Sequence, residues 1–395
     1  MKAVGIVAEY NPFHNGHAYQ IQTVRKELEP DVVVAVMSGN FLQRGEPAIV
    51  DKWTRTQMAL AGGVDLVIEL PVIFSTQPAD YFARGAIQIF DALGLDAISF
   101  GVEEGTGANF LKGAQWLVEN EDQINEEIQN ATSYNVPYAK QMEDIIQKLS
   151  PDFPLYLNSP NNQLGFTYAK EIVRQRLTDT IEMYPLMRKS AGYDDPALAL
   201  GSTIASATAI RRAQIRGEDV AAYLPVDSYT YFKEAENQMV TWEDYFSYLK
   251  YQLTVQSGEE LRDIYQMTEG IENRLKDSIQ ETNTFEDFME KIKTKRYTQT
   301  RLQRLLTYTL LQWSNSKVHA ALDSPNSLRV LGFREAGQRY LSQMKRQVKR
   351  PFLTNVNQKN ADMLTFDLSA SAIYRLGRPQ AIPEQEFTQK PIKYD

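Results

Sequence analysis

The chain has 395 residues, 43% of them apolar, no cysteine and a formal net charge of −8. This length and apolar content allow one large core or two to three smaller ones. The apolar run in Met1–Glu9 is too short for a signal peptide, and the best candidate span, Val64–Phe74, is interrupted by two acids. We therefore expect a cytoplasmic protein with no membrane partner.

The first hundred residues alternate between apolar, β-branched runs and helical patterns, which predicts a parallel sheet with βαβ crossovers. Strands are expected at residues 2–8, 32–37, 64–69 and 96–100, and helices at Gly16–Leu28, Lys52–Ala61 and Ala79–Leu93. This pattern is typical of a doubly wound, Rossmann-like α/β sheet. Ligands of such sheets bind beyond the carboxyl ends of the strands, where the turns after these strands should gather.

The turn after the first strand carries His14 and His17, two of the three histidines of the chain. Unpaired backbone N–H groups and the positive dipole end form an anion site at such a helix start. We expect the two histidines to donate to a phosphate there. Metal ligation is one alternative, although cysteine is absent and His319 is distant in sequence. A purely structural pair, with one histidine capping the helix, is another.

The rest of the chain is predicted to be mainly helical. Helices cover most of residues 105–178, a strand follows near Thr180–Met183, and long amphipathic helices include Glu259–Asp277 and Arg301–Trp313. This change of pattern predicts two domains. They are a catalytic α/β domain over residues 1–230 and a mainly helical domain over residues 231–395.

Basic residues are concentrated late in the chain. Between Lys291 and Arg350 there are fourteen Lys and Arg against two acids, so this segment is near +12 and the remainder near −20. The asymmetry indicates a basic surface that contacts RNA on an otherwise acidic protein. Solvated faces of ordinary helices are the alternative.

Five motifs together resemble one known family. They are GIVAEYNPFHNGHAYQ, MSGNFLQRGEPAIVDKWTRTQMALAGGVDLVIELP (Met37–Pro71), SFGVEEG (Ser99–Gly105), SPNNQLGFTYAK (Ser159–Lys170) and ASATAIRR (Ala205–Arg212). The first contains the signature of the HxGH nucleotidyltransferase superfamily, whose members activate a substrate by attack on the α-phosphate of ATP. The whole set, over residues 1–230, resembles the bacterial tRNA(Met) cytidine acetate ligase family. No KMSKS signature is present, which disfavours an amino-acid-activating enzyme.

The motif around Ser206 is similar to the Ser-Ser-Thr-x-Ile-Arg stretch of these nucleotidyltransferases, which binds the β- and γ-phosphates opposite the histidines. Ala207 replaces the second serine here, so only Ser206, Thr208, Arg211 and the backbone amides carry over. From the residues alone, hydroxyl groups at a helix start are also ordinary N-caps. Both interpretations stay open.

Two residue pairs and one glycine gain a role from the resemblance. Asn161 and Asn162 could form a turn, and Arg188 and Lys189 could be a solvated pair. The resemblance implies that they lie in the ATP site, where an Asn amide reads adenine or ribose and Arg188 neutralises phosphate charge. Gly101 would let the backbone approach the adenosine closely.

The predicted site residues form three groups, and the resemblance implies the first two. The catalytic group is His14 and His17, which stabilise charge on the α-phosphate and bridging oxygen, and Arg211, which with Mg²⁺ neutralises pyrophosphate. The ATP-binding group is Val7, Ala8, Glu9, Tyr10, Asn11, Pro12, Phe13, His14, Asn15, Gly16, His17, Ala18, Tyr19, Gln20, Gly101, Asn161, Asn162, Arg188, Lys189, Ser206 and Thr208. The tRNA-binding group is drawn from the basic segment: Lys293, Lys295, Arg296, Lys345, Arg346, Lys349 and Arg350.

The resemblance also implies the reaction. Acetate would be activated as acetyl-adenylate, and its acetyl group would pass to N4 of the wobble cytidine (C34) of elongator tRNA(Met). A metabolite adenylyltransferase that makes a dinucleotide-type product is the alternative enzyme. A non-catalytic RNA-binding protein with a relic nucleotide pocket is the alternative from another class, and the presence of both histidines and Arg211 counts against it.

Overall fold

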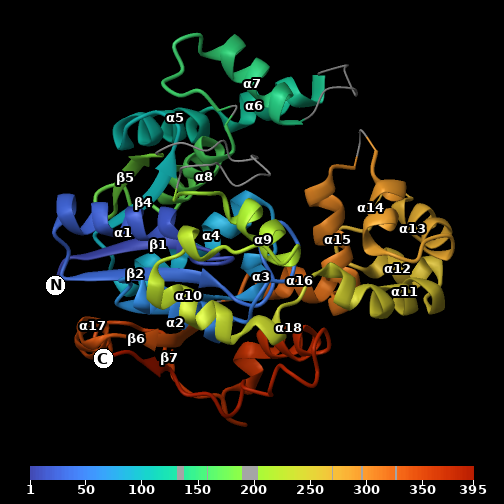
Figure 1. Ribbon diagram of the computed structural model, residues 1–395. Coiled ribbons are helices and arrows are strands. Elements are labelled where there is room, and N and C mark those ends of the chain that lie inside the picture. Colours follow the sequence, from blue (N-terminus) through green and yellow to red (C-terminus); the bar gives the residue numbers. More distant parts are fainter. Residues whose placement is uncertain (131–137, 158, 189–202, 269, 295–296, 325–326) are drawn as a thin grey trace.

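The computed structural model describes residues 1–130, 138–157, 159–188, 203–268, 270–294, 297–324 and 327–395. Eight strands in these residues form one sheet with the order β5-β4-β1-β2-β3-β6-β7, and β8 pairs with β6 (Figure 1). The parallel strands are β1 (Ala3–Ala8), β2 (Val32–Ser38), β3 (Leu66–Leu70), β4 (Ala97–Val102) and β5 (Glu182–Met187). The chain continues from β1 to β2 and β3 on one side and returns to β4 and β5 on the other. The predicted doubly wound sheet is confirmed, and its switch point lies between β1 and β4.

Helices cover both faces of the sheet because the side chains of its central strands are apolar on both sides. Along β2, Val33 and Ala35 belong to one buried cluster, whereas Val32 and Val34 belong to the other. The first face is covered by α1 (Asn15–Leu28), α2 (Lys52–Ala61), α9 (Ala207–Ile215) and α10 (Val226–Glu234). The second face is covered by α3 (Val72–Ser75), α4 (Ala79–Leu93), α5 (Gly107–Glu119), α8 (Pro160–Arg174) and α17 (Glu335–Met344). Helices α6 (Glu121–Asn130) and α7 (Tyr138–Leu149) contact each other near α5 (Figure 1).

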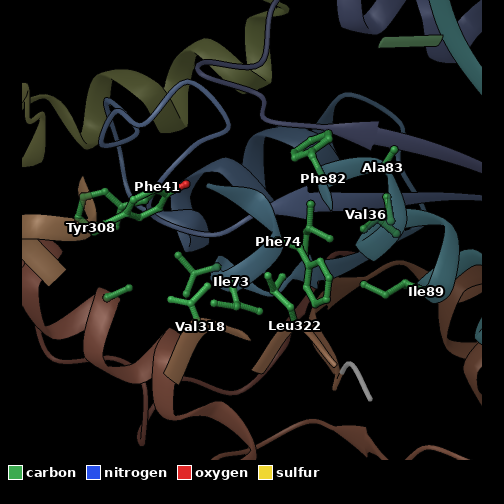
Figure 2. Packing of buried hydrophobic residues seen from close by; sticks show 14 of the residues in the cluster. Val36, Phe41, Ile73, Phe74, Phe82, Ala83, Ile89, Tyr308, Val318 and Leu322 are labelled. Atoms are coloured by element: carbon green, nitrogen blue, oxygen red, sulfur yellow. The ribbon is translucent and has the colours of Figure 1, made fainter. Parts of the chain in front are cut away.

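A group of helices forms a lobe to one side of the sheet (Figure 1). They are α11 (Phe246–Val255), α12 (Gly258–Asp263), α13 (Ile271–Gln280), α14 (Phe285–Ile292), α15 (Gln299–Leu311) and α16 (Asn315–Leu322), preceded by short 3₁₀ turns at Ala221–Tyr223, Glu236–Gln238 and Trp242–Tyr245. Figure 2 shows Val318 and Leu322 of α16 beside Ile73 and Phe74 of α3. The core of the lobe is therefore continuous with that of the sheet.

One predicted helix of this lobe is wrong. The single helix expected over Glu259–Asp277 is broken between α12 and α13. After α12, Ile264 forms a β-bridge with Ser314, and the N–H of Tyr265 donates to the carbonyl of Trp313 at 2.8 Å. These two backbone contacts hold the chain in a non-helical turn that local periodicity could not predict.

The chain then returns to the sheet, which the sequence analysis did not predict. Strand β6 (Leu328–Phe333) runs antiparallel to β3, and β7 (Phe352–Leu353) and β8 (Ile392–Lys393) pair with β6. A 3₁₀ turn (Ala361–Leu364) and α18 (Thr365–Arg375) lie between β7 and β8. The second half of the chain is mainly helical but adds strands to the first sheet, and the division near residue 230 stays a prediction. Within the described residues, no helix is long and apolar enough to cross a bilayer.

Candidate active site

His14 is the N-cap of α1, and its ring lies against that of His17. His14 Nδ1 accepts a hydrogen bond from the N–H of Gly16 at 3.0 Å, and His17 Nδ1 accepts one from the N–H of His14 at 3.2 Å. The ring centroids are 3.7 Å apart. Because both Nδ1 atoms accept, each neutral ring carries its hydrogen on Nε2, which is left to donate to a ligand. The capping interpretation is confirmed for His14, and it is compatible with a phosphate-binding role.

Burial keeps both rings neutral. Desolvation, followed by the positive charges of Arg188 and Arg211, lowers the pKa of His14 to about 3. Desolvation, followed by the neighbouring His14, lowers the pKa of His17 well below its ordinary value. The imidazoles at the start of α1 are therefore neutral N–H donors.

The start of α9 forms the opposite wall. Ser206 Oγ accepts a hydrogen bond from the N–H of Ala209 at 3.1 Å, which confirms Ser206 as an N-cap. Arg211 donates from Nη1 to the carbonyl of Asn11 at 2.8 Å, and its Nη2 lies 3.1 Å from Glu46 Oε1. The guanidinium predicted to neutralise pyrophosphate is thus paired with a carboxylate from the loop after β2.

Asn15, at the start of α1, is bonded to the two segments that flank α9. Its Nδ2 donates to the carbonyl oxygens of Thr203 at 2.8 Å and Ala222 at 3.0 Å. The next residue, Gly16, has no room for a side chain, because a Cβ there would lie 2.8 Å from His14 Cε1. In the sequence His-Asn-Gly-His, Asn15 therefore binds the segments that flank α9. The absence of a side chain at Gly16 leaves room for the His14 ring.

A cavity of about 310 Å³ lies between these walls, beyond the carboxyl ends of β1, β4 and β5. This is the place that the switch point of the sheet predicts for a ligand. The predicted site residues that line the cavity are Val7, Ala8, Glu9, Tyr10, Asn11, His14, Gly16, His17, Tyr19, Gln20, Gly101, Asn161, Arg188, Ser206, Thr208 and Arg211. The structure thus brings together residues from both ends of the predicted catalytic segment.

Arg188 lies where β5 meets the start of α8. Its Nη1 donates to Asn161 Oδ1 at 3.1 Å, and a Cβ on Gly101 would lie 3.3 Å from Arg188 Cγ. Asn161 follows Pro160 in the first turn of α8, so the Asn pair belongs to a helix and not to an isolated turn. Asn161 Nδ2 in turn donates to the Glu103 carboxylate. This network holds the Arg188 guanidinium beside the cavity.

Several predicted residues support the cavity without lining it: Pro12, Phe13, Asn15, Ala18 and Asn162. The Asn162 amide holds the loop after β4, because its Oδ1 accepts from the N–H of Glu103 at 3.1 Å and its Nδ2 donates to the carbonyl of Tyr156 at 3.1 Å. Lys189 lies outside the described residues. ATP contacts by these residues stay predictions.

The sequence analysis missed the loop after β2 and an apolar wall. The missed lining residues are Ile6, Gln43, Arg44, Glu46, Phe82, Phe100, Leu164, Gly165, Tyr168, Leu186, Met187, Ile204, Ala205 and Ala207. A charged, glycine-containing loop at the carboxyl end of a central strand was the available signal for Gln43, Arg44 and Glu46. The apolar wall had no signal beyond ordinary core patterning.

Two carboxylates lie close together in the cavity. Burial, followed by the charge of Glu46, raises the pKa of Glu9, while a hydrogen bond from the N–H of Gln43 at 2.9 Å opposes the rise. Among the residues that the structure describes, no group of three or more His, Asp or Glu could hold a metal ion.

The predicted tRNA-binding residues fall into two separate groups. Lys293 is exposed just after α14, and Lys345, Arg346 and Lys349 are exposed just after α17, where Arg350 is half-buried. Lys295 and Arg296 lie outside the described residues. Helices α14 and α17 are on opposite sides of the molecule (Figure 1). The basic segment therefore does not form one continuous patch.

Comparison with known proteins first defines the class. A family model described as HIGH Nucleotidyl Transferase matches residues 1–390, nearly the whole chain. A crystal structure of apo Thermotoga maritima TmcAL (form I) superposes with a TM-score of 0.91 at 30% identity, covering 100% of this chain and 99% of that one. The fold and the histidine turn are thus those of a HIGH nucleotidyltransferase.

Curated relatives narrow the class. The tRNA(Met) cytidine acetate ligase of Bacillus licheniformis is 40% identical, covering 100% of this chain and 98% of the relative. The chain belongs to the tRNA(Met) cytidine acetate ligase family, which confirms the resemblance seen in the sequence. Thermotoga maritima TmcAL bound with alpha-thio ATP superposes with a TM-score of 0.89 at 30% identity, covering 100% of this chain and 99% of that chain.

Proposed function

We propose that the protein activates acetate with ATP and transfers the acetyl group to N4 of the wobble cytidine (C34) of elongator tRNA(Met). The observation that carries this proposal is that His14, His17 and the start of α9 line one cavity, with the Nδ1 atoms of both rings already occupied as acceptors. Full-length similarity to ligases of this name supports the choice of substrates.

In the first step, a carboxylate oxygen of acetate attacks the α-phosphorus of ATP. The bond from that phosphorus to the bridging oxygen breaks, and pyrophosphate leaves. Both imidazoles donate from Nε2 to oxygens around the α-phosphate, where charge develops. The α9 amides and the Thr208 hydroxyl face the β- and γ-phosphates from the other wall. Arg211 exchanges the Glu46 carboxylate for a phosphate oxygen.

Magnesium is expected to enter with the phosphates of ATP, because this ion is commonly bound through one or two carboxylates together with substrate phosphates. Glu9 and Glu46 both line the cavity, so they are the carboxylates that would hold the ion. Burial and the charge of Glu46 raise the pKa of Glu9, and a nearby cation would favour its charged form. When bound, the ion would supply positive charge that offsets the charge of the leaving pyrophosphate.

In the second step, N4 of cytidine attacks the acetyl carbonyl of acetyl-adenylate. The bond between that carbon and the phosphate oxygen breaks, AMP leaves, and N4 loses a proton to give N4-acetylcytidine. Lys293, Lys345, Arg346, Lys349 and Arg350 remain the proposed basic contacts to the tRNA. Because they form two groups on opposite sides, we expect only one group to lie near the target cytidine.

The test uses purified protein with labelled acetate, ATP and total bacterial tRNA, followed by digestion of the RNA to nucleosides. We expect labelled N4-acetylcytidine that requires ATP and disappears in the His17→Ala variant. Pyrophosphate release with a small mononucleotide and no modified RNA would indicate a metabolite adenylyltransferase instead. A protein that gives neither product would contradict any adenylating role.

A further inference from the structure

The loop after β2 connects the cavity to the helical lobe. Arg44 and Glu46 line the cavity, and Gly45 between them faces away toward α15. A Cβ on Gly45, whose φ is +71°, would lie 2.2 Å from the backbone nitrogen of Arg304. Trp242 fixes the same residue, because its Nε1 donates to the Gly45 carbonyl at 3.0 Å. Arg304 is therefore held one residue away from the lining of the cavity.

Among the residues that the structure describes, no carboxylate pairs with the positive charge of Arg304. Its side chain is half-buried, and its Nε is buried without a hydrogen-bond partner among the described residues. Burial lowers its pKa, and Arg301 one turn earlier on α15 lowers it further. The neighbouring phenols of Tyr265 and Tyr308 have raised pKa values, so they carry no charge near neutral pH. Charges that are partly removed from water are normally paired, so this guanidinium is one that a bound anion could pair.

We propose that Arg304 binds a backbone phosphate of the tRNA beside the nucleotide that enters the cavity. The proposal rests on the proposed function and adds a positioning residue to it. A guanidinium stays charged at physiological pH and offers several donors in a fork that matches phosphate oxygens. Arg304 does not line the cavity, so it is outside the space expected for ATP. Its backbone instead packs on Gly45, next to Arg44, which lines the cavity.

The test is the Arg304→Gln variant, which keeps most of the side-chain length and removes the charge. Its matched control is Lys317→Gln on α16, which removes one exposed charge from the next helix. Direct binding of tRNA is measured against salt concentration, and binding of ATP is measured separately. For Arg304→Gln we expect a several-fold weaker tRNA Kd and a salt slope that is shallower by about 0.7 to 0.9. We expect unchanged ATP affinity in both variants, and unchanged tRNA binding in the control.

The melting temperature distinguishes phosphate binding by Arg304 from a role in packing alone. If Arg304 serves a ligand, removal of its half-buried charge should leave the melting temperature unchanged or raise it. A clear drop in melting temperature would show a structural residue and overturn the proposal. Arg304→Lys, which keeps the charge, should retain the wild-type salt slope. If Arg304→Gln does not fold, Arg304→Lys provides the test. A salt slope of Arg304→Lys that is shallower than the wild-type slope by about 0.7 to 0.9 would then count against the proposal.

The readouts also distinguish this proposal from the proposed function. Binding of tRNA is measured without acetyl transfer. Weaker tRNA binding by Arg304→Gln would therefore support the RNA contact even if the wild-type protein forms no acetylcytidine. Equal loss of ATP affinity would assign Arg304 to the nucleotide and overturn the RNA contact. Unchanged tRNA affinity and salt slope in a folded Arg304→Gln variant would overturn it as well.

Discussion

His14→Asn separates the two uses of the His14 ring. The asparagine oxygen is a favoured N-cap acceptor, so it can replace Nδ1 at the start of α1. Asparagine has no donor at the position of Nε2. Loss of one donor to charge that develops in the transition state lowers kcat by about 10²- to 10³-fold, which is about 3 to 4 kcal/mol. We expect acetate-dependent exchange of pyrophosphate into ATP to fall by this factor.

His14→Ala is the matched control for the cap. It removes both the donor and the acceptor, so the exchange rate should fall as far as in His14→Asn. Its free energy of unfolding should also drop by about 1 kcal/mol, whereas His14→Asn should stay within about 0.5 kcal/mol of the wild type. Urea unfolding of all three proteins gives this comparison. Full exchange activity in His14→Asn, or a loss of activity that follows a loss of stability, would refute the reasoning.

Three further predictions concern other contacts. Asn15→Ala removes two hydrogen bonds to the segments that flank α9, each worth about 0.5 to 1.5 kcal/mol. The KM for ATP should therefore rise about 5- to 150-fold with little change in kcat, and an unchanged KM would contradict this. Glu46→Gln removes the charge that pairs with Arg211, and a phosphate oxygen must replace this partner when ATP binds. The KM for ATP should therefore fall by up to about 5-fold. A higher KM would show that Glu46 stabilises the complex with ATP. Burial, followed by the charge of Glu69, raises the pKa of Asp367 in the folded protein to about 7. As pH rises from about 4 to 7, Asp367 therefore ionises in the unfolded state before it does so in the folded state, and the free energy of unfolding falls. Asp367→Asn should lose less stability between pH 5 and pH 7 in urea unfolding, and an equal loss would argue against this titration.

Local patterns made the sheet and the histidine turn predictable from the sequence. Apolar runs of strand length alternate with helical periodicity through β4, and each run pairs as a parallel strand. The His-Asn-Gly-His turn marks the start of α1, because the glycine and both rings act within one helical turn. The motif at Ser206 likewise marks the start of α9. These signals depend on neighbours in sequence, so a single chain reveals them.

Features that depend on distant pairing were not predictable. Strand β6 contains Arg329, and a charged residue argues against a buried strand until Glu69 and Glu386 are seen to pair with it. The ion pair between Arg211 and Glu46 joins segments far apart in sequence in the same way. A count of charges along the chain also could not show that α14 and α17 lie on opposite sides.

A crystal structure of this protein with a non-hydrolysable ATP analogue tests the central claim most directly. We predict that the triphosphate lies between the two helix starts, with the Nε2 atoms of His14 and His17 on one side and the α9 amides on the other. Arg211 should then contact a phosphate oxygen in place of Glu46. A triphosphate bound elsewhere, or histidine rings that face away from it, would contradict the account.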